Sequence, residues 1–176
     1  METLLKISKA VDATNLAIAR GVKWLVLITA ALSAFNALAR KFFHIGSNAL
    51  LEAQWYLFAA IFLLYAGTTL LQQDHVRVDL FYRKYSAKTK CVLEIVGAVF
   101  CIFPLAGVVI YLGSGVFWTA FVENEVSVNP GGLAIWPARL LVPAGFSLLA
   151  AQAVSEIIKN VVKLREMKTV TTPTSP

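Results

Sequence analysis

The stretch that decides the fold is VLEIVGAVFCIFPLAGVVIYLGSGVFWTAF, which runs from Val92 to Phe121 and contains one charged residue, Glu94. A run this long and this apolar exceeds the roughly 20 residues that a helix needs to cross a bilayer. In lipid every backbone amide must be hydrogen-bonded within the protein, and the run lacks the alternating pattern of a barrel strand. It therefore predicts a transmembrane helix.

Three further apolar runs can also span a bilayer: Val22 to Leu38, Leu50 to Leu71 and Leu133 to Val154. Of the 176 residues, 58% are hydrophobic and only 15% are charged, which is not the composition of a water-soluble globule. The sequence predicts an all-α integral membrane protein with four transmembrane helices. We expect residues 1–165 to form this single domain and the Thr/Ser/Pro-rich residues 166–176 to be a mobile cytoplasmic tail.

The third run is too long for a straight helix that simply crosses the membrane. At 1.5 Å per residue it would measure about 45 Å, against a hydrocarbon core of about 30 Å. Pro104 lacks a backbone N–H, so we expect a bend between Cys101 and Pro104. Three glycines farther along are expected to let a neighbouring helix approach closely: Gly107, Gly113 and Gly115.

Basic residues fall almost entirely on one side of the predicted spans. They occupy the N-terminal segment, the loop between the second and third spans and the C-terminal segment, whereas the other two loops contain only Arg40 and Lys41. Under the positive-inside rule, this asymmetry places both termini of a multi-pass membrane protein in the cytoplasm. The loosely amphipathic residues 4–19 are compatible with a helix that lies on the cytoplasmic membrane surface.

Several functional classes have no support in the sequence. The net charge of +6 does not indicate nucleic-acid binding, because the basic residues lie between apolar runs and not in one patch. His44 and His75 fall in different loops, and Cys91 and Cys101 are about 15 Å apart along one helix, so neither a metal site nor a disulfide is expected. We predict no cofactor and no catalytic group, and we do not expect an enzyme.

Charged residues at the edges of membrane helices require partners or water. Arg40, Glu52 and Arg139 all fall near the outer ends of predicted spans, so we expect an ion-paired cluster that serves structure or assembly. The alternative is that Glu52 carries a proton or cation. We favour the structural interpretation, because coupling carboxylates are usually expected near the middle of the membrane.

Two loops contain further candidates. Between the second and third spans, His75, Arg77 and Asp79 alternate with apolar residues. They either lock this loop onto helix ends or a partner subunit, or belong to an ordinary basic loop that fixes the topology. In the outer loop before the fourth span, Glu123 and Glu125 are candidates for contact with a soluble partner, although solvated carboxylates are the commoner explanation.

One ordered set of motifs spans about residues 36–154. It consists of Arg40, Glu52 with Gln54-Trp55-Tyr56-Leu57-Phe58, Gly67, the element His75-Val76-Arg77-Val78-Asp79, Glu125 with Ser127, and Trp136-Pro137. The His-Val-Arg-Val-Asp element is the most specific part. In order and spacing the set resembles the small, Q-type subunit of tripartite ATP-independent periplasmic (TRAP) transporters.

This resemblance implies a lipid-embedded scaffold subunit of the bacterial inner membrane that partners a large permease subunit. The large subunit would hold the substrate and sodium sites and move by an elevator mechanism, while a periplasmic substrate-binding protein delivers organic acids to the outer face. A scaffold would rely on close helix contacts, for which Gly67 and Gly107 are candidates. The rival hypothesis is a self-sufficient four-helix carrier that exchanges protons through Glu52 and transports without a partner.

Overall fold

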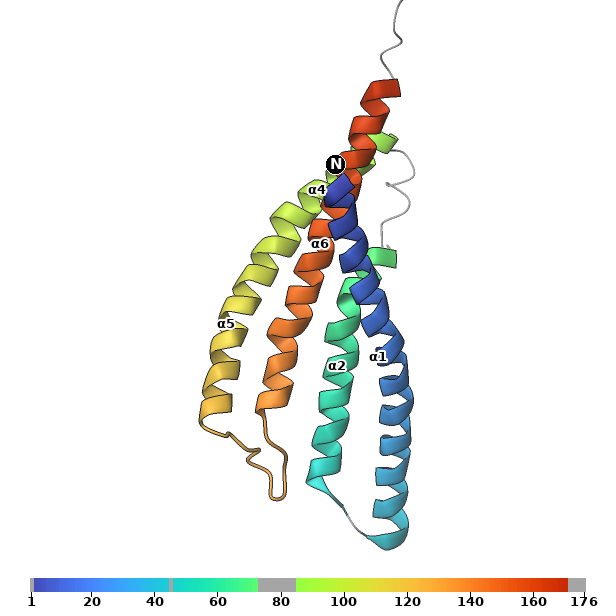
Figure 1. Ribbon diagram of the computed structural model, residues 1–176. Coiled ribbons are helices and arrows are strands. Elements are labelled where there is room, and N and C mark those ends of the chain that lie inside the picture. Colours follow the sequence, from blue (N-terminus) through green and yellow to red (C-terminus); the bar gives the residue numbers. More distant parts are fainter. Residues whose placement is uncertain (1, 45, 73–84, 171–176) are drawn as a thin grey trace, which may run out of the picture.

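The computed structural model describes residues 2–44, 46–72 and 85–170 (Figure 1). The helices are α1 (Glu2–Phe43), α2 (Asn48–Gln72), α4 (Ala87–Gly97), the π-helical segment η1 (Ala98–Ile102), α5 (Phe103–Val122) and α6 (Trp136–Val170). Because α4, η1 and α5 follow one another without a break, they form a single span from Ala87 to Val122. Four helices are therefore long and apolar enough to cross a membrane, and no strand forms among the described residues, which confirms the predicted fold.

The helices form a row in which α6 lies between α5 and α2, and α1 lies beyond α2 (Figure 1). The N-terminal half of α1 also reaches α6. We call the end that carries residues 44–47 and 123–135 the loop end, and the end that carries the N-terminus and the last turns of α6 the terminal end. The two inner helices of the row, α6 and α2, each have a helix on both sides, and the apolar window of α6 is more buried than those of the other three spans.

Helix boundaries follow from local capping chemistry. Ser47 precedes α2 and its Oγ accepts a hydrogen bond from the backbone N–H of Leu50 at 3.4 Å. Ser86 caps α4 in the same way through Thr89 N–H, at 3.2 Å. Pro137 is the second residue of α6, where its missing N–H would have no helical partner.

The N-terminal segment differs from the expected surface helix. It is helical, but it continues without interruption into the first span to give a helix of 42 residues. Ser8 and Asn15 are 2% and 1% exposed, and both contact α6. These two polar side chains therefore pack against another helix, whereas Lys6 and Lys9 are exposed.

Just before Pro104, where we expected a bend, the long span contains a π-helical turn. Segment η1 ends two residues before Pro104, and the backbone N–H of Phe103 donates to the carbonyl of Ala98, an i to i−5 bond. A wide turn of this kind re-pairs backbone groups where the i−4 ladder is broken. Proline chemistry therefore determines where the long span changes its helical geometry.

The prediction that glycines allow close helix approach is confirmed at Gly67 and Gly113 and is wrong at Gly107 and Gly115. A Cβ atom on Gly113 would lie 3.4 Å from Pro143 of α6, whereas one on Gly107 or Gly115 would meet nothing within 4 Å. A Cβ on Gly67 would overlap the Asn15 amide and lie 3.3 Å from the Leu148 carbonyl. The closest approach to another backbone is at Gly145, where a Cβ would lie 2.8 Å from the Leu63 carbonyl oxygen.

Candidate functional site

The carboxylate of Glu52 is the centre of the polar contacts at the loop end. Glu52 is only 4% exposed although it lies near the start of α2. Its oxygens accept hydrogen bonds from the Ser127 hydroxyl, from Asn129 Nδ2 at 2.9 Å and from the backbone N–H of Leu133 at 2.7 Å. A carboxylate with three donors is well satisfied, and all three donors come from the α5–α6 loop.

The α5–α6 loop is folded back on itself so that these donors converge. Ser127 N–H donates to the Leu133 carbonyl, and Ile135 N–H donates to the Glu125 carbonyl, both at 2.9 Å. A Cβ on Gly132 would overlap Ser127 and lie 2.9 Å from Glu52 Oε2, so only glycine fits there. The loop is thus shaped to enclose the Glu52 carboxylate.

Arg139 holds the same loop from the other side. Its guanidinium makes a two-bond ion pair with the Glu125 carboxylate, in which Nη2 donates to Oε1 at 2.8 Å and Nη1 donates to Oε2. The two side chains are 30% and 35% exposed, so water screens their attraction. We refer to the bonds of Glu52 and Arg139 to residues 125–133 as the loop clamp.

The three residues expected to form one ion-paired cluster are divided between two places. Glu52 and Arg139 hold the same loop, but through different partners. Arg40 lies away from the clamp, on a hollow between α1 and α2 that Asn36 and Gln54 also line. Geometry thus gives Glu52 and Arg139 a structural contact, while a role of these three residues in subunit assembly stays a prediction.

The other predicted site residues have separate outcomes. Glu125 belongs to the loop clamp, whereas Glu123 ends α5 with an exposed side chain. Two apolar side chains of the same loop, Val126 and Val128, are 63% and 97% exposed. The predicted motif of His75, Arg77 and Asp79 lies outside the described residues.

A polar network at the terminal end was not predicted. Asp12 of α1 accepts hydrogen bonds from Gln152 Nε2 and Ser155 Oγ, each at 2.8 Å, and pairs with Lys159 Nζ at 2.8 Å. Asn15 Nδ2 donates to Gln152 Oε1 at 2.8 Å. Gln152 is completely buried, so these bonds join the N-terminal half of α1 to α6 from inside the protein.

Two further contacts extend this terminal-end network to the neighbouring helices. Thr68 of α2 donates to the Asn15 carbonyl at 3.1 Å, and Asn160 of α6 donates to Glu94 of α4 at 2.8 Å. The spacing of polar residues along α1 and α6 is the sequence signal that would have revealed this network. Polar residues recur on one face of α1 at Ser8, Asp12 and Asn15, and a matching series on α6 consists of Gln152, Ser155 and Lys159.

Comparison with known proteins identifies the family. No curated protein and no solved structure matches the chain. Residues 20–163 match the family described as tripartite ATP-independent periplasmic transporters, DctQ component. That match includes all four spans and both halves of the loop clamp. The chain therefore belongs to the DctQ family and is a small membrane subunit of a TRAP transporter.

Proposed function

We propose that this chain is the stationary scaffold of a sodium-coupled TRAP importer of organic acids. It holds a large permease subunit that contains the substrate and sodium sites and moves during transport. A periplasmic substrate-binding protein delivers the substrate. The family match and the ordered motifs from Arg40 to Pro137 support this assignment.

The observation that carries the scaffold role is the state of Glu52. A carrier that exchanges protons through this carboxylate needs it to lose its partners during each cycle. Glu52 instead accepts three hydrogen bonds from one loop and is 4% exposed, so its release breaks all three bonds at once. Fixed bonds of this kind suit a subunit that keeps its shape while its partner moves.

The loop end is the proposed docking face for the binding protein. The basic residues favour a cytoplasmic location for the terminal end, which leaves the loop end in the periplasm. There the α5–α6 loop presents the Glu123 carboxylate beside the exposed side chains of Val126 and Val128. A rim charge next to an apolar contact is typical of transient protein interfaces, and the loop clamp keeps this face in one conformation.

The proposal is tested by reconstitution into liposomes with a sodium gradient. We expect uptake of labelled organic acids only when this chain, its large subunit and its binding protein are all present. We expect none from this chain alone. Uptake by the chain alone that the Glu52→Gln substitution abolishes would contradict the scaffold role and establish the proton-coupled carrier.

A further inference from the structure

A hollow of about 430 Å³ opens between α1 and α2 near the loop end. It is separate from the loop clamp, because it is lined by α1 residues together with Leu51 and Gln54 of α2. Its polar side chains are those of Ser33, Asn36, Arg40, Lys41 and Gln54. Nothing in the scaffold role requires such a group of side chains between two membrane helices.

Two side-chain amides in this hollow each have one atom without a hydrogen-bond partner in the part of the chain that the structure describes. Asn36 is 5% exposed, and its Oδ1 has no hydrogen-bond partner among the described residues; the same holds for Gln54 Nε2. Ser33 donates to Gln54 Oε1 at 3.0 Å, which fixes the amide so that its nitrogen is the unpartnered end. A buried polar atom without a partner is costly in a membrane protein, so a bound molecule that satisfies both amides is favoured.

The charges indicate what such a molecule carries. Arg40 and Lys41 are exposed neighbours on this hollow, and no ion pair among the described residues engages either side chain. Glu52, two residues before Gln54, is occupied by the loop clamp. Two cations and an amide N–H offer donors to anionic oxygens, and Asn36 Oδ1 accepts from a hydroxyl. A phosphate ester with a hydroxylated group matches this set.

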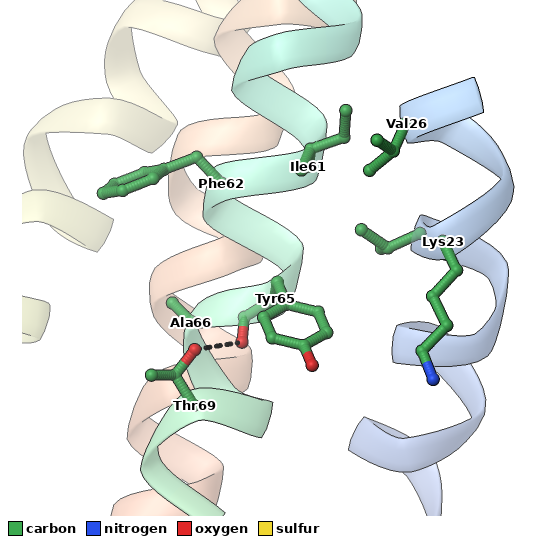
Figure 2. A pocket seen from close by; sticks show the side chains of 8 residues that line it. Lys23, Val26, Ile61, Phe62, Tyr65, Ala66 and Thr69 are labelled. Carbon is green, nitrogen blue, oxygen red and sulfur yellow. Dashed lines mark hydrogen bonds between the residues drawn. The ribbon is translucent and has the colours of Figure 1, made fainter. Parts of the chain in front are cut away.

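The interface, or seam, between α1 and α2 contains an apolar hollow as well as this one. A second hollow of about 550 Å³ lies farther along the same helices and is lined mainly by apolar side chains, among them Val26, Ile61, Phe62 and Tyr65 (Figure 2). Asn36 and Val26 are ten residues apart on α1, or about 15 Å. That distance equals half of the roughly 30 Å hydrocarbon core, the depth that one acyl chain occupies.

Both hollows lie on the same faces of the two helices. On α1 the lining positions are Val22, Val26, Ser33 and Asn36, which are separated by three, four or seven residues and so share one helix face. On α2, Gln54 and Ile61 are seven residues apart and likewise share a face. Figure 2 shows the Tyr65 ring in the space between α2 and α1. One molecule with a charged head and an apolar chain can therefore lie along this seam.

We propose that the seam binds an anionic phospholipid, with its phosphate at Arg40, Lys41 and Gln54 and a headgroup hydroxyl at Asn36. The acyl chain extends toward Val26 and covers the apolar side chains between α1 and α2. The lipid belongs to the leaflet at the loop end, whichever compartment that end faces. The site is independent of the transport role, because it needs only the geometry of this chain.

The test is native mass spectrometry of the full chain with added phosphatidylglycerol or phosphatidylcholine. The wild-type chain should retain phosphatidylglycerol in preference. The double variant Arg40→Ala with Lys41→Ala should retain roughly tenfold less, because two charge-assisted contacts are lost. A matched control, Lys9→Ala with Arg20→Ala, removes the same charge from exposed positions near the terminal end and should bind as the wild type does.

A second variant and a soluble competitor separate the possible ligands. Asn36→Leu keeps both charges and should reduce phosphatidylglycerol retention about threefold, as expected for one neutral hydrogen bond. Glycerol phosphate at millimolar concentration should not displace the lipid. Equal losses in the target and control double variants, displacement by glycerol phosphate, or a photo-crosslinker at Ala37 that captures the large subunit and no lipid would each overturn the proposal.

Discussion

At the residue scale, Glu52 shows how a membrane-edge carboxylate can be structural. A charge is costly in a low-dielectric setting unless donors surround it. Ser127, Asn129 and the Leu133 N–H supply those donors, and the bonds are local to one loop. The ion pair of Arg139 with Glu125 is more exposed, so we expect it to contribute at most about 1 kcal/mol.

The first prediction compares two glutamates at the loop end. Glu52→Ala removes the charged acceptor of three partly buried hydrogen bonds, at up to about 1–3 kcal/mol for each bond, and should lower the melting temperature in detergent markedly. Glu123→Ala removes an exposed carboxylate and should change stability by less than about 0.5 kcal/mol. Equal melting temperatures for the two variants would show that the loop clamp does not stabilise the fold.

The sequence predicted which polar residues matter at the loop end better than it predicted their partners. Glu52 and Arg139 stand out because charges are rare in apolar runs. Their partners depend on how residues 123–135 fold, and the turn at Gly132 is selected by contacts with Ser127 and Glu52 rather than by local pattern. A tertiary contact of this kind leaves no periodic signal in a single sequence.

At the element scale, the row of helices depends on close backbone contact between α2 and α6. The contact occurs at Gly145, which has the Leu63 side chain and carbonyl against it. Membrane helices associate largely by van der Waals packing, so small residues at such contacts are favoured. The sequence shows where the glycines are, but not which face of each helix meets a neighbour, which is why the expectation failed at Gly107 and Gly115.

A glycine pair gives the second prediction. Gly145→Ala places a methyl group against the Leu63 backbone, which cannot move without shifting α2, and should destabilise the protein by about 1–3 kcal/mol. Gly107→Ala meets open space and should be neutral or stabilising, because alanine favours a helix by up to about 1 kcal/mol. Unfolding in detergent distinguishes the two, and a Gly145→Ala variant as stable as Gly107→Ala would refute the close contact.

The terminal-end network gives the third prediction. Gln152→Leu keeps the side-chain size but removes the hydrogen bonds to Asp12, Asn15 and Glu156. The N-terminal half of α1 should then separate from α6 more often, and trypsin should cleave after Lys9 several-fold faster than in the wild type.

The matched control for this measurement is an exposed glutamine. Gln72→Leu changes the same kind of side chain at the exposed end of α2, where Gln72 accepts a 3.5 Å hydrogen bond from Tyr65. We expect cleavage after Lys9 to be unchanged in this variant. If cleavage is accelerated equally in both variants, or if neither variant is cleaved faster than the wild type, Gln152 does not hold α1 on α6.

At the scale of the whole molecule, the four spans were predictable because hydropathy and length are properties of the chain alone. Their arrangement in a row was not, because it depends on which faces pack. The row leaves many large apolar side chains exposed, including Phe62 at 74% and Tyr111 at 77%. Such faces need lipid or a partner subunit, which agrees with a small component of a larger membrane complex.

Orientation gives the last prediction, because the scaffold role requires the loop end to face the binding protein. Val128 is 97% exposed at the loop end, and Lys163 is exposed at the terminal end. In a variant without Cys91 and Cys101, a membrane-impermeant thiol reagent added to intact cells should label Val128→Cys but should reach Lys163→Cys only after the membrane is permeabilised. The physical cause is the excess of Lys and Arg around the terminal end, which favours retention in the cytoplasm. Labelling of Lys163→Cys alone in intact cells would show the opposite orientation. The α5–α6 loop would then face the wrong compartment for a periplasmic partner.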